Sequence, residues 1–186
     1  MIAAEVERED KRSEVRSAAC GFPTVIDAET QHGIEQYLFR EAALLDDRNW
    51  EAWETLFADD GMYWVPLAHD QADPFNHASL FYEDAMMREV RRRRLVNDRA
   101  WSQQPVTRTA RTIGNVIVTG GSVADGKLIV QSSFHLTEWR ARRTERHLAG
   151  RYTHSLVAAD GAWKIEQKRV DLISCDGVQF AFEFFL

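Results

Sequence analysis

The second half of the chain alternates strand-like segments with turn residues, and this pattern limits the fold more than any other feature. Four segments are predicted, at residues 112–119, 128–140, 147–157 and 163–173. Their connections carry residue pairs that favour tight hairpins over helical crossovers, namely Gly120-Gly121, Asp125-Gly126 and Asp160-Gly161. Hairpins join antiparallel neighbours, so we predict a meander and exclude a doubly wound parallel sheet.

Helices are expected before this meander. Ile34 and Leu45 belong to a set of apolar residues at helical spacing, which predicts an amphipathic helix from Thr30 to about Asp46-Asp47. Asn49 can cap a short second helix. Three further elements are predicted, a strand at 62–66, a loop at 68–79 and a third helix at 83–96.

The expected domain organisation is simple. A chain of 186 residues has the usual size of one domain, which we assign to residues 29–186. Residues 1–28 are interpreted as an N-terminal arm, because they are charged at first and then interrupted by Gly21 and Pro23. Helices followed by an antiparallel meander place the domain in the α+β class.

The last predicted strand contains an irregularity that predicts a bend. Trp163 and Ile165 have one parity, whereas Val170 and Leu172 have the other, so a regular strand would send the two pairs to opposite faces. A bulge near Gln167-Lys168 would return them to one apolar face. Since bulges bend strands, we expect a curved sheet wrapped around a core.

The composition argues against several classes of function. The formal charge of -6 gives no general reason to expect a nucleic-acid partner. Cys20 and Cys175 are the only cysteines and begin no C-x-x-C or C-x-H pattern, so we expect no zinc or iron–sulfur site in this chain. No apolar run has the length of a membrane span, and residues 1–16 do not resemble a signal peptide. We therefore expect no membrane partner and a cytoplasmic protein with free thiols.

A segment with two histidines superficially fits a two-histidine, one-carboxylate iron site. His69 and His77 lie near Asp70 and Asp73 in the sequence. Their spacing fits no shared helix face, and Pro74 interrupts the segment. We therefore favour a solvated loop over a metal site, which would need ligands converging on one position.

His154 is the strongest candidate for chemistry in this chain. Strand parity places it with Tyr152 and Leu156 on an inward face, where a curved sheet could bring it near Asp46 or Asp47. Such an acid–base dyad in an apolar pocket would suit proton transfer or dehydration. We favour the alternative of a hydrogen-bonded core histidine, because nothing nearby in the sequence marks a substrate.

Four consecutive arginines, residues 91–94, occupy the third predicted helix. Four such residues span most of the helix circumference, so they cannot all face solvent on one side. Arg94 is expected to reach toward the core or a partner, because it follows Met86 and Val90 at intervals of four. A solvated face with one or two ion pairs is favoured over binding of RNA or DNA.

The end of the chain is too apolar to be left in water. Residues 180–186 read FAFEFFL. They either complete the core of this domain or pack against another chain, and the sequence favours neither alternative.

Several segments, taken together, resemble the β subunits of Rieske-type aromatic-ring-hydroxylating dioxygenases. They are 41–46 (EAALLD) with Trp53 and 56–57, 63–67 (YWVPL), 81–84 (FYED) with 88–95, 101–105 (WSQQP) with 108–109 (RT) and 114–116 (GNV), and 150–152 (GRY) through 163–165 (WKI). The resemblance covers about residues 34–175, and the WSQQP segment followed by RT is its most specific part. The sequence departs from the commoner pattern at Ala110 and at its phenylalanine-rich end.

The resemblance implies a fold and a partner. The fold is the NTF2-like cone, in which N-terminal helices pack on a strongly curved, mainly antiparallel sheet. The partners are a catalytic α subunit and other β subunits, typically as α3β3, with ferredoxin and reductase acting through α. The α subunit of such enzymes carries the Rieske [2Fe-2S] cluster and the mononuclear Fe(II), so the resemblance transfers no catalytic residue and no cofactor to this chain.

The main hypothesis is therefore a structural β subunit of an enzyme that uses NAD(P)H and O2 for cis-dihydroxylation of an aromatic ring. Six residues are predicted at subunit contacts, because aromatic and arginine side chains anchor interfaces and the tail is apolar: Trp101, Gln103, Arg108, Phe184, Phe185 and Leu186. The competing hypothesis is a free-standing NTF2-like isomerase or dehydratase that uses His154 with Asp46 or Asp47. A third is a cone that binds a small ligand without chemistry.

Overall fold

The computed structural model describes residues 26–97, 99, 104–143, 145–179 and 181–186. Its elements, in chain order, are α2 (Ala28–Asp46), α3 (Trp50–Glu54), β1 (Phe57–Pro66), β2 (Ser79–Glu83), α4 (Ala85–Val96), β3 (Arg108–Ser122), β4 (Lys127–Trp139), β5 (Arg146–Ala159) and β6 (Ala162–Leu172). The predicted order of two helices, a strand, a helix and a meander is found, with one further strand, β2, before α4.

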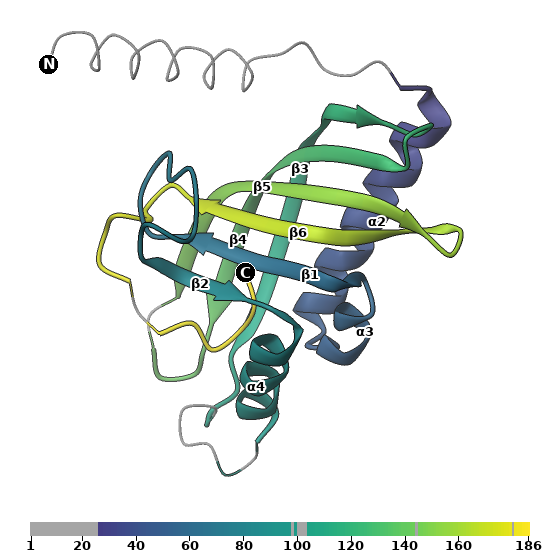
Figure 1. The fold of residues 1–186 in the computed structure, drawn as a ribbon. Coiled ribbons are helices and arrows are strands. Elements are labelled where there is room, and N and C mark those ends of the chain that lie inside the picture. Colours follow the sequence, from purple (N-terminus) through teal and green to yellow (C-terminus); the bar gives the residue numbers. More distant parts are fainter. Residues whose placement is uncertain (1–25, 98, 100–103, 144, 180) are drawn as a thin grey trace, which may run out of the picture.

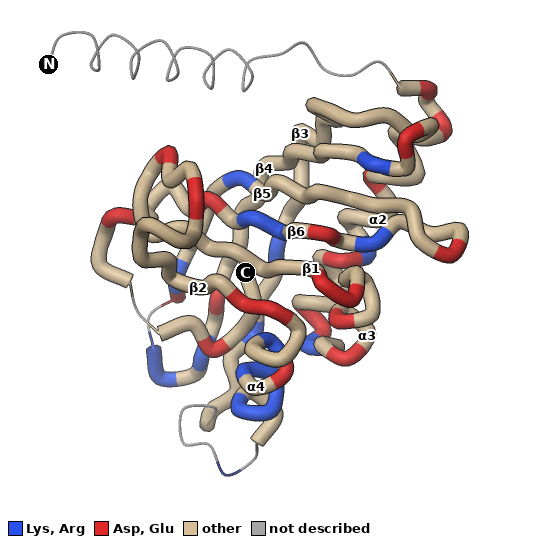
Figure 2. Tube along the Cα trace, viewed as in Figure 1, with Lys and Arg blue, Asp and Glu red and all other residues tan. Residues whose placement is uncertain are grey.

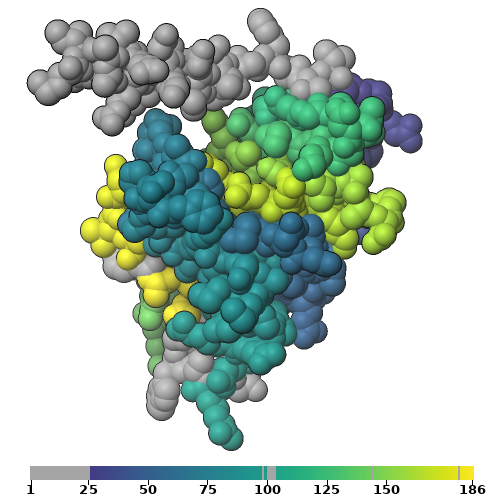
Figure 3. Space-filling view, viewed as in Figure 1, coloured from purple at the N-terminus to yellow at the C-terminus, as the bar shows by residue number. Residues whose placement is uncertain are grey.

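One six-stranded sheet, in the order β2-β1-β6-β5-β4-β3, organises the molecule. Neighbouring strands are antiparallel except β1 and β6, which are parallel. The sheet curves around α2, and α4 lies at the narrow end of the molecule (Figure 1, Figure 3). The predicted α+β class is therefore confirmed, and the concave side of the sheet forms the core with α2 and α3.

A short polar side chain caps the N-terminus of each described helix. Asp27 accepts a hydrogen bond from the backbone N–H of Thr30 at 2.8 Å, so α2 begins two residues before the predicted start. Asn49 caps α3 as predicted, and Asp84 caps α4. Each cap satisfies a backbone donor that would otherwise lack a partner in the first turn.

The predicted bulge in the last strand is confirmed, and it lies at Glu166. Ser155 of β5 pairs with Gln167 and the next residue, Leu156, pairs with Ile165, so Glu166 has no opposite residue. Ile165 and Lys168 are consequently both buried on the concave side of the sheet, although they differ in parity.

One strand, β2, was not predicted from the sequence. β2 covers Ser79–Glu83, where the sequence predicted the end of a loop and the start of a helix. It is a five-residue strand at the edge of the sheet, and it pairs only with β1. Its residues are mostly half-buried, so it lacks the alternation of apolar and polar positions that identifies a strand with one buried face.

The apolar tail packs inside the chain's own core. Phe184, Phe185 and Leu186 are each no more than 3% exposed. The ring of Phe185 lies 4.6 Å from that of Trp53 and 6.0 Å from that of Trp50. Of the two alternatives for the tail, completion of this core is what the structure shows.

None of the helices in the described ranges combines the length and the apolar character needed to span a bilayer.

Two glycines offer a matched test of the packing in this fold. A Cβ added at Gly150 in β5 would lie 2.1 Å from the carbonyl oxygen of Asp171 and 2.9 Å from the ring of Phe134, whereas one added at Gly33 in α2 would meet nothing within 4 Å. We predict that Gly150→Ala lowers the free energy of unfolding by about 3 kcal/mol through overpacking. Gly33→Ala should raise it by about 0.5–1 kcal/mol because alanine favours the helix. Urea denaturation of both variants checks this, and equal effects would contradict it.

Candidate functional site

Three ionisable side chains are enclosed between α2 and the sheet. Glu41 comes from α2, His154 from β5 and Lys168 from β6, and each is at most 2% exposed. Charged groups are rarely buried so completely unless they are paired. This group, here called the Glu41 cluster, is therefore the first candidate for a site.

The geometry of the Glu41 cluster is closed. Glu41 Oε1 accepts hydrogen bonds from Lys168 Nζ at 2.8 Å and from Trp53 Nε1 at 3.0 Å. Glu41 Oε2 lies 2.9 Å from His154 Nε2, and the imidazole donates because an ionised carboxylate only accepts. Both carboxylate oxygens are thus engaged by donors from three other elements.

The sequence positions each member of the cluster for a local reason. Glu41 lies three residues after Leu38 and four before Leu45, so it belongs to the buried stripe of α2. His154 faces inward by the parity of β5, as predicted. Lys168 faces inward because the bulge at Glu166 shifts the parity of β6 by one residue.

The predicted partner of His154 is wrong. Asp46 accepts hydrogen bonds from Thr109 Oγ1 and from the backbone N–H of Arg111, each at 2.8 Å, and Asp47 is exposed. Glu41 takes their place because it lies on the helix face turned to β5. A glutamate inside an otherwise apolar helical stripe was the available signal.

Burial and pairing act in opposite directions on these groups. Burial alone raises the pKa of Glu41, but the positive charge of Lys168 and the contact with His154 hold it well below its usual range. Burial lowers the pKa of Lys168, and Glu41 opposes this shift. The carboxylate therefore stays ionised under ordinary conditions and compensates the buried ammonium.

Aromatic rings surround the cluster. Tyr152 stacks on Phe134 with 4.0 Å between ring centroids, and its ring lies 4.4 Å from Lys168 Nζ. The Tyr152 hydroxyl has no hydrogen-bond partner among the described residues, and burial raises the pKa of this group. These rings fill the space beside the charges and keep water away from them.

The arginine-rich helix turns different residues inward from those predicted. Arg94 is exposed, so of its two predicted directions the core is wrong, and contact with a partner stays a prediction. Arg88 and Arg91 are buried instead, because they share the helix face of Leu95. Arg88 binds Glu54 at 2.7 Å, and Arg91 binds Glu83 at 3.0 Å while lying 4.0 Å from the ring centroids of both Phe81 and Phe185.

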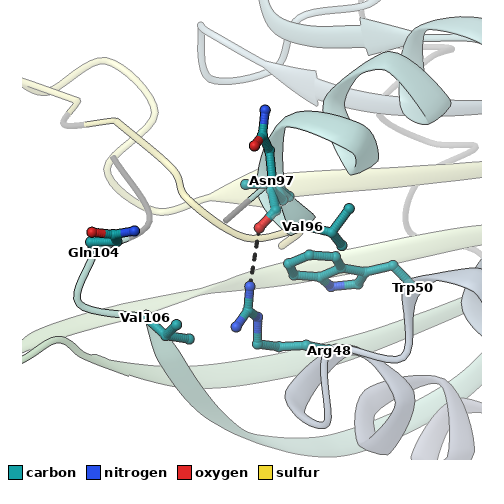
Figure 4. A pocket seen from close by; sticks show the side chains of 7 residues that line it. Arg48, Trp50, Val96, Asn97, Gln104 and Val106 are labelled. Carbon is teal, nitrogen blue, oxygen red and sulfur yellow. Dashed lines mark hydrogen bonds between the residues drawn. The ribbon is translucent and has the colours of Figure 1, made fainter. Parts of the chain in front are cut away.

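A cavity of about 440 Å³ lies elsewhere, at the end of α4 (Figure 4). Val96 and Val106 line it together with Trp50 and Arg48. The Arg48 guanidinium donates to the carbonyl of Leu95 at 3.1 Å and lies 4.8 Å from the centroid of the Trp50 ring. The cavity is open to solvent on the surface formed by α4 and residues 104–106, and it does not include the Glu41 cluster.

The histidine-containing segment is a surface loop. His69 and Asp70 are more than three-quarters exposed and 3.6 Å apart, and His77 is also exposed. Asp73 binds the backbone N–H groups of Phe75 and Asn76. In the part of the chain that the structure describes, no three His, Cys, Asp or Glu residues are grouped as metal ligands.

The six residues predicted at subunit contacts lie in different environments. Trp101 and Gln103 lie outside the described residues. Arg108 is exposed and stacks over Trp139 at 4.2 Å. The three tail residues are buried in the chain's own core, and the interface role of the whole set stays a prediction.

Comparison with known proteins identifies the family. Residues 40–176 match the family described as ring hydroxylating beta subunit. The chain is 32% identical over 139 residues to the β subunit of benzene 1,2-dioxygenase from Pseudomonas putida, covering 69% of this chain and 72% of that one. The chain belongs to the ring-hydroxylating β-subunit family.

Solved structures agree with this family. The β subunit of benzoate 1,2-dioxygenase from Burkholderia mallei superposes with a TM-score of 0.65 at 28% identity, covering 80% of this chain and 92% of that one. A chain of naphthalene 1,2-dioxygenase superposes with a TM-score of 0.76 at 19% identity, covering 96% and 98%. The predicted NTF2-like cone of these β subunits is confirmed.

The Glu41 cluster makes a prediction about stability. Glu41→Gln leaves Lys168 buried without a counter-charge, so we expect it to lower the free energy of unfolding by about 3–5 kcal/mol. Glu166→Gln is the matched control, because Glu166 pairs with Lys127 at the surface and should change stability by about 1 kcal/mol or less. The double variant Glu41→Gln/Lys168→Met should lose less unfolding free energy than the single variants Glu41→Gln and Lys168→Met lose together. Strict additivity in urea denaturation would contradict the coupling.

The low pKa of Glu41 also predicts a dependence on pH. In the unfolded chain the Glu41 carboxylate takes up a proton near the ordinary glutamate pKa of 4.5. In the folded chain it stays ionised at that pH, because its pKa is lowered. The stabilisation from Glu41 is thus fully present above that value and is lost as pH falls below it. The difference in unfolding free energy between the wild type and Glu41→Gln should shrink from pH 7 to pH 3. A constant difference across that range would show that Glu41 titrates normally.

Proposed function

We propose that this chain is the non-catalytic, structural β subunit of a multicomponent aromatic-ring dioxygenase. Its role is to stabilise the assembly of the catalytic α subunit, in a complex of three α and three β chains in the cytoplasm. The observation that carries this proposal is the closed Glu41 cluster, which fills the interior of a chain that belongs to a β-subunit family.

The enclosed cluster argues against chemistry in this chain. A general acid or base must lie within hydrogen-bond reach of the substrate and must exchange its proton during turnover. His154 is fully buried and its Nε2 is already engaged by Glu41, whose own oxygens are both occupied. We therefore prefer the structural role to an isomerase or dehydratase.

The proposed reaction belongs to the partner. In the proposed enzyme the α subunit holds the Rieske [2Fe-2S] cluster and the mononuclear Fe(II), receives electrons from ferredoxin and reductase, and cis-dihydroxylates an aromatic ring with NAD(P)H and O2. Relatives of this chain are β subunits of enzymes named for benzene, chlorobenzene, biphenyl and benzoate. An aromatic hydrocarbon or an aromatic carboxylate is accordingly the proposed class of substrate.

Co-expression tests this proposal. The chain should co-purify with a ring-hydroxylating dioxygenase α chain of the same organism as a hetero-oligomer with bound iron, and dihydroxylation should need both chains. His154→Gln in the isolated chain should reveal no loss of isomerase or dehydratase turnover, because none is expected beforehand. A chain that stays monomeric at high concentration and never captures α would refute the proposal.

A further inference from the structure

Five exposed arginines gather at the narrow end of the molecule, in a chain whose net charge is -6. These arginines come from the end of α4 and the residues just after it, from the start of β3, and from the turn between β4 and β5. They are Arg94, Arg99, Arg108, Arg142 and Arg143. Figure 2 shows basic residues along α4 and in the turn that follows β4. We call this surface the basic end.

Direct contacts tie the three segments of the basic end together. Arg140 Nη2 donates to the carbonyl of Gln104 at 3.3 Å, which joins the β4–β5 turn to the segment before β3. Arg108 stacks over Trp139 at 4.2 Å. The 440 Å³ cavity is lined by Val96 from α4 and by Val106, which joins the end of α4 to the same segment (Figure 4).

The positive charge of the basic end is not neutralised within the chain. Over the described ranges, none of its five arginines has a carboxylate within ion-pairing distance. Nearby carboxylates are engaged elsewhere, Glu138 with Arg146 and Glu145 with His147. Like charges close together in space repel one another, so carboxylates from another molecule would relieve this repulsion.

The centre of the basic end is apolar. Val96 is 51% exposed, Val106 45% and Trp139 40%, and the two valines border the cavity. An apolar centre with arginines around it is the usual composition of a protein–protein interface. A cavity of this volume can admit one large apolar side chain of a partner.

We propose that the basic end is the surface on which the α subunit docks, through an acidic patch that surrounds an apolar side chain inserted between Val96 and Val106. This inference rests on the proposed function and adds the location and chemistry of the contact. A second copy of this chain could not dock through its own basic end, because two basic ends repel each other, and it would have to present a different surface. Moreover, Glu51 and Glu54 of α3 and Glu89 of α4 are already paired with arginines of α4.

Charge reversal tests the electrostatic part of the proposal. We expect Arg142→Glu/Arg143→Glu to reduce the α chain that co-purifies with full-length β by about tenfold or more. The matched control is Arg40→Glu/Arg151→Glu, which reverses two exposed arginines outside the basic end that form no ion pair within the described ranges. Circular dichroism and the thermal midpoint should match those of the wild type in both variants, because all four side chains are exposed.

Val106→Asp tests the apolar centre. It should also reduce capture of α about tenfold, whereas Ile117→Asp, at 43% exposure on β3, should not. The proposal is overturned if the basic-end variants capture α as well as their controls, and the proposed function then still stands. It is also overturned if they lose only self-association of β, since a second copy is then the occupant. If the wild type itself captures no α, the proposed function fails as well.

Discussion

The fold depends on one carboxylate at the centre of its core. Glu41 engages an ammonium, an imidazole and an indole N–H that come from three different elements. Lys168 could not remain buried without it, because an unpaired charge in such an apolar interior is very costly. The position of α2 over the sheet is thereby fixed by direction-dependent polar contacts as well as by apolar packing, which tolerates sliding.

The bulge at Glu166 is the backbone feature that makes this arrangement possible. A regular β6 would turn Lys168 to the convex side, leaving Glu41 with fewer donors, or would turn Ile165 outward. One additional residue in one strand thus brings an apolar and a charged side chain to the same face. The same bulge bends the sheet, and the bend gives α2 a concave surface to fill.

Local patterns predicted the architecture, whereas tertiary partners decided the site. The Asn49 cap, the meander and the bulge follow from spacing and turn chemistry, so they could be predicted from the sequence. The inward face of His154 also followed from strand parity. Its partner did not, because the choice between Glu41 and Asp46 depends on how far α2 slides along the sheet. Likewise, the inward face of α4 is set by its contacts with Phe57 and Phe81, which no helical spacing reveals.

The buried tail has a consequence for how the protein is made. Trp50 and Trp53 lie in the first elements of the domain, yet Phe185, which packs against both, follows every strand in the chain. During synthesis Phe185 emerges from the ribosome long after Trp50 and Trp53. The rings of the two tryptophans therefore stay exposed to solvent on the side that Phe185 later covers. Contacts between distant parts of a sequence also slow folding. The nascent chain is therefore prone to aggregation until Phe185 has emerged, and the packing of Phe185 on the two tryptophans is a late step of folding.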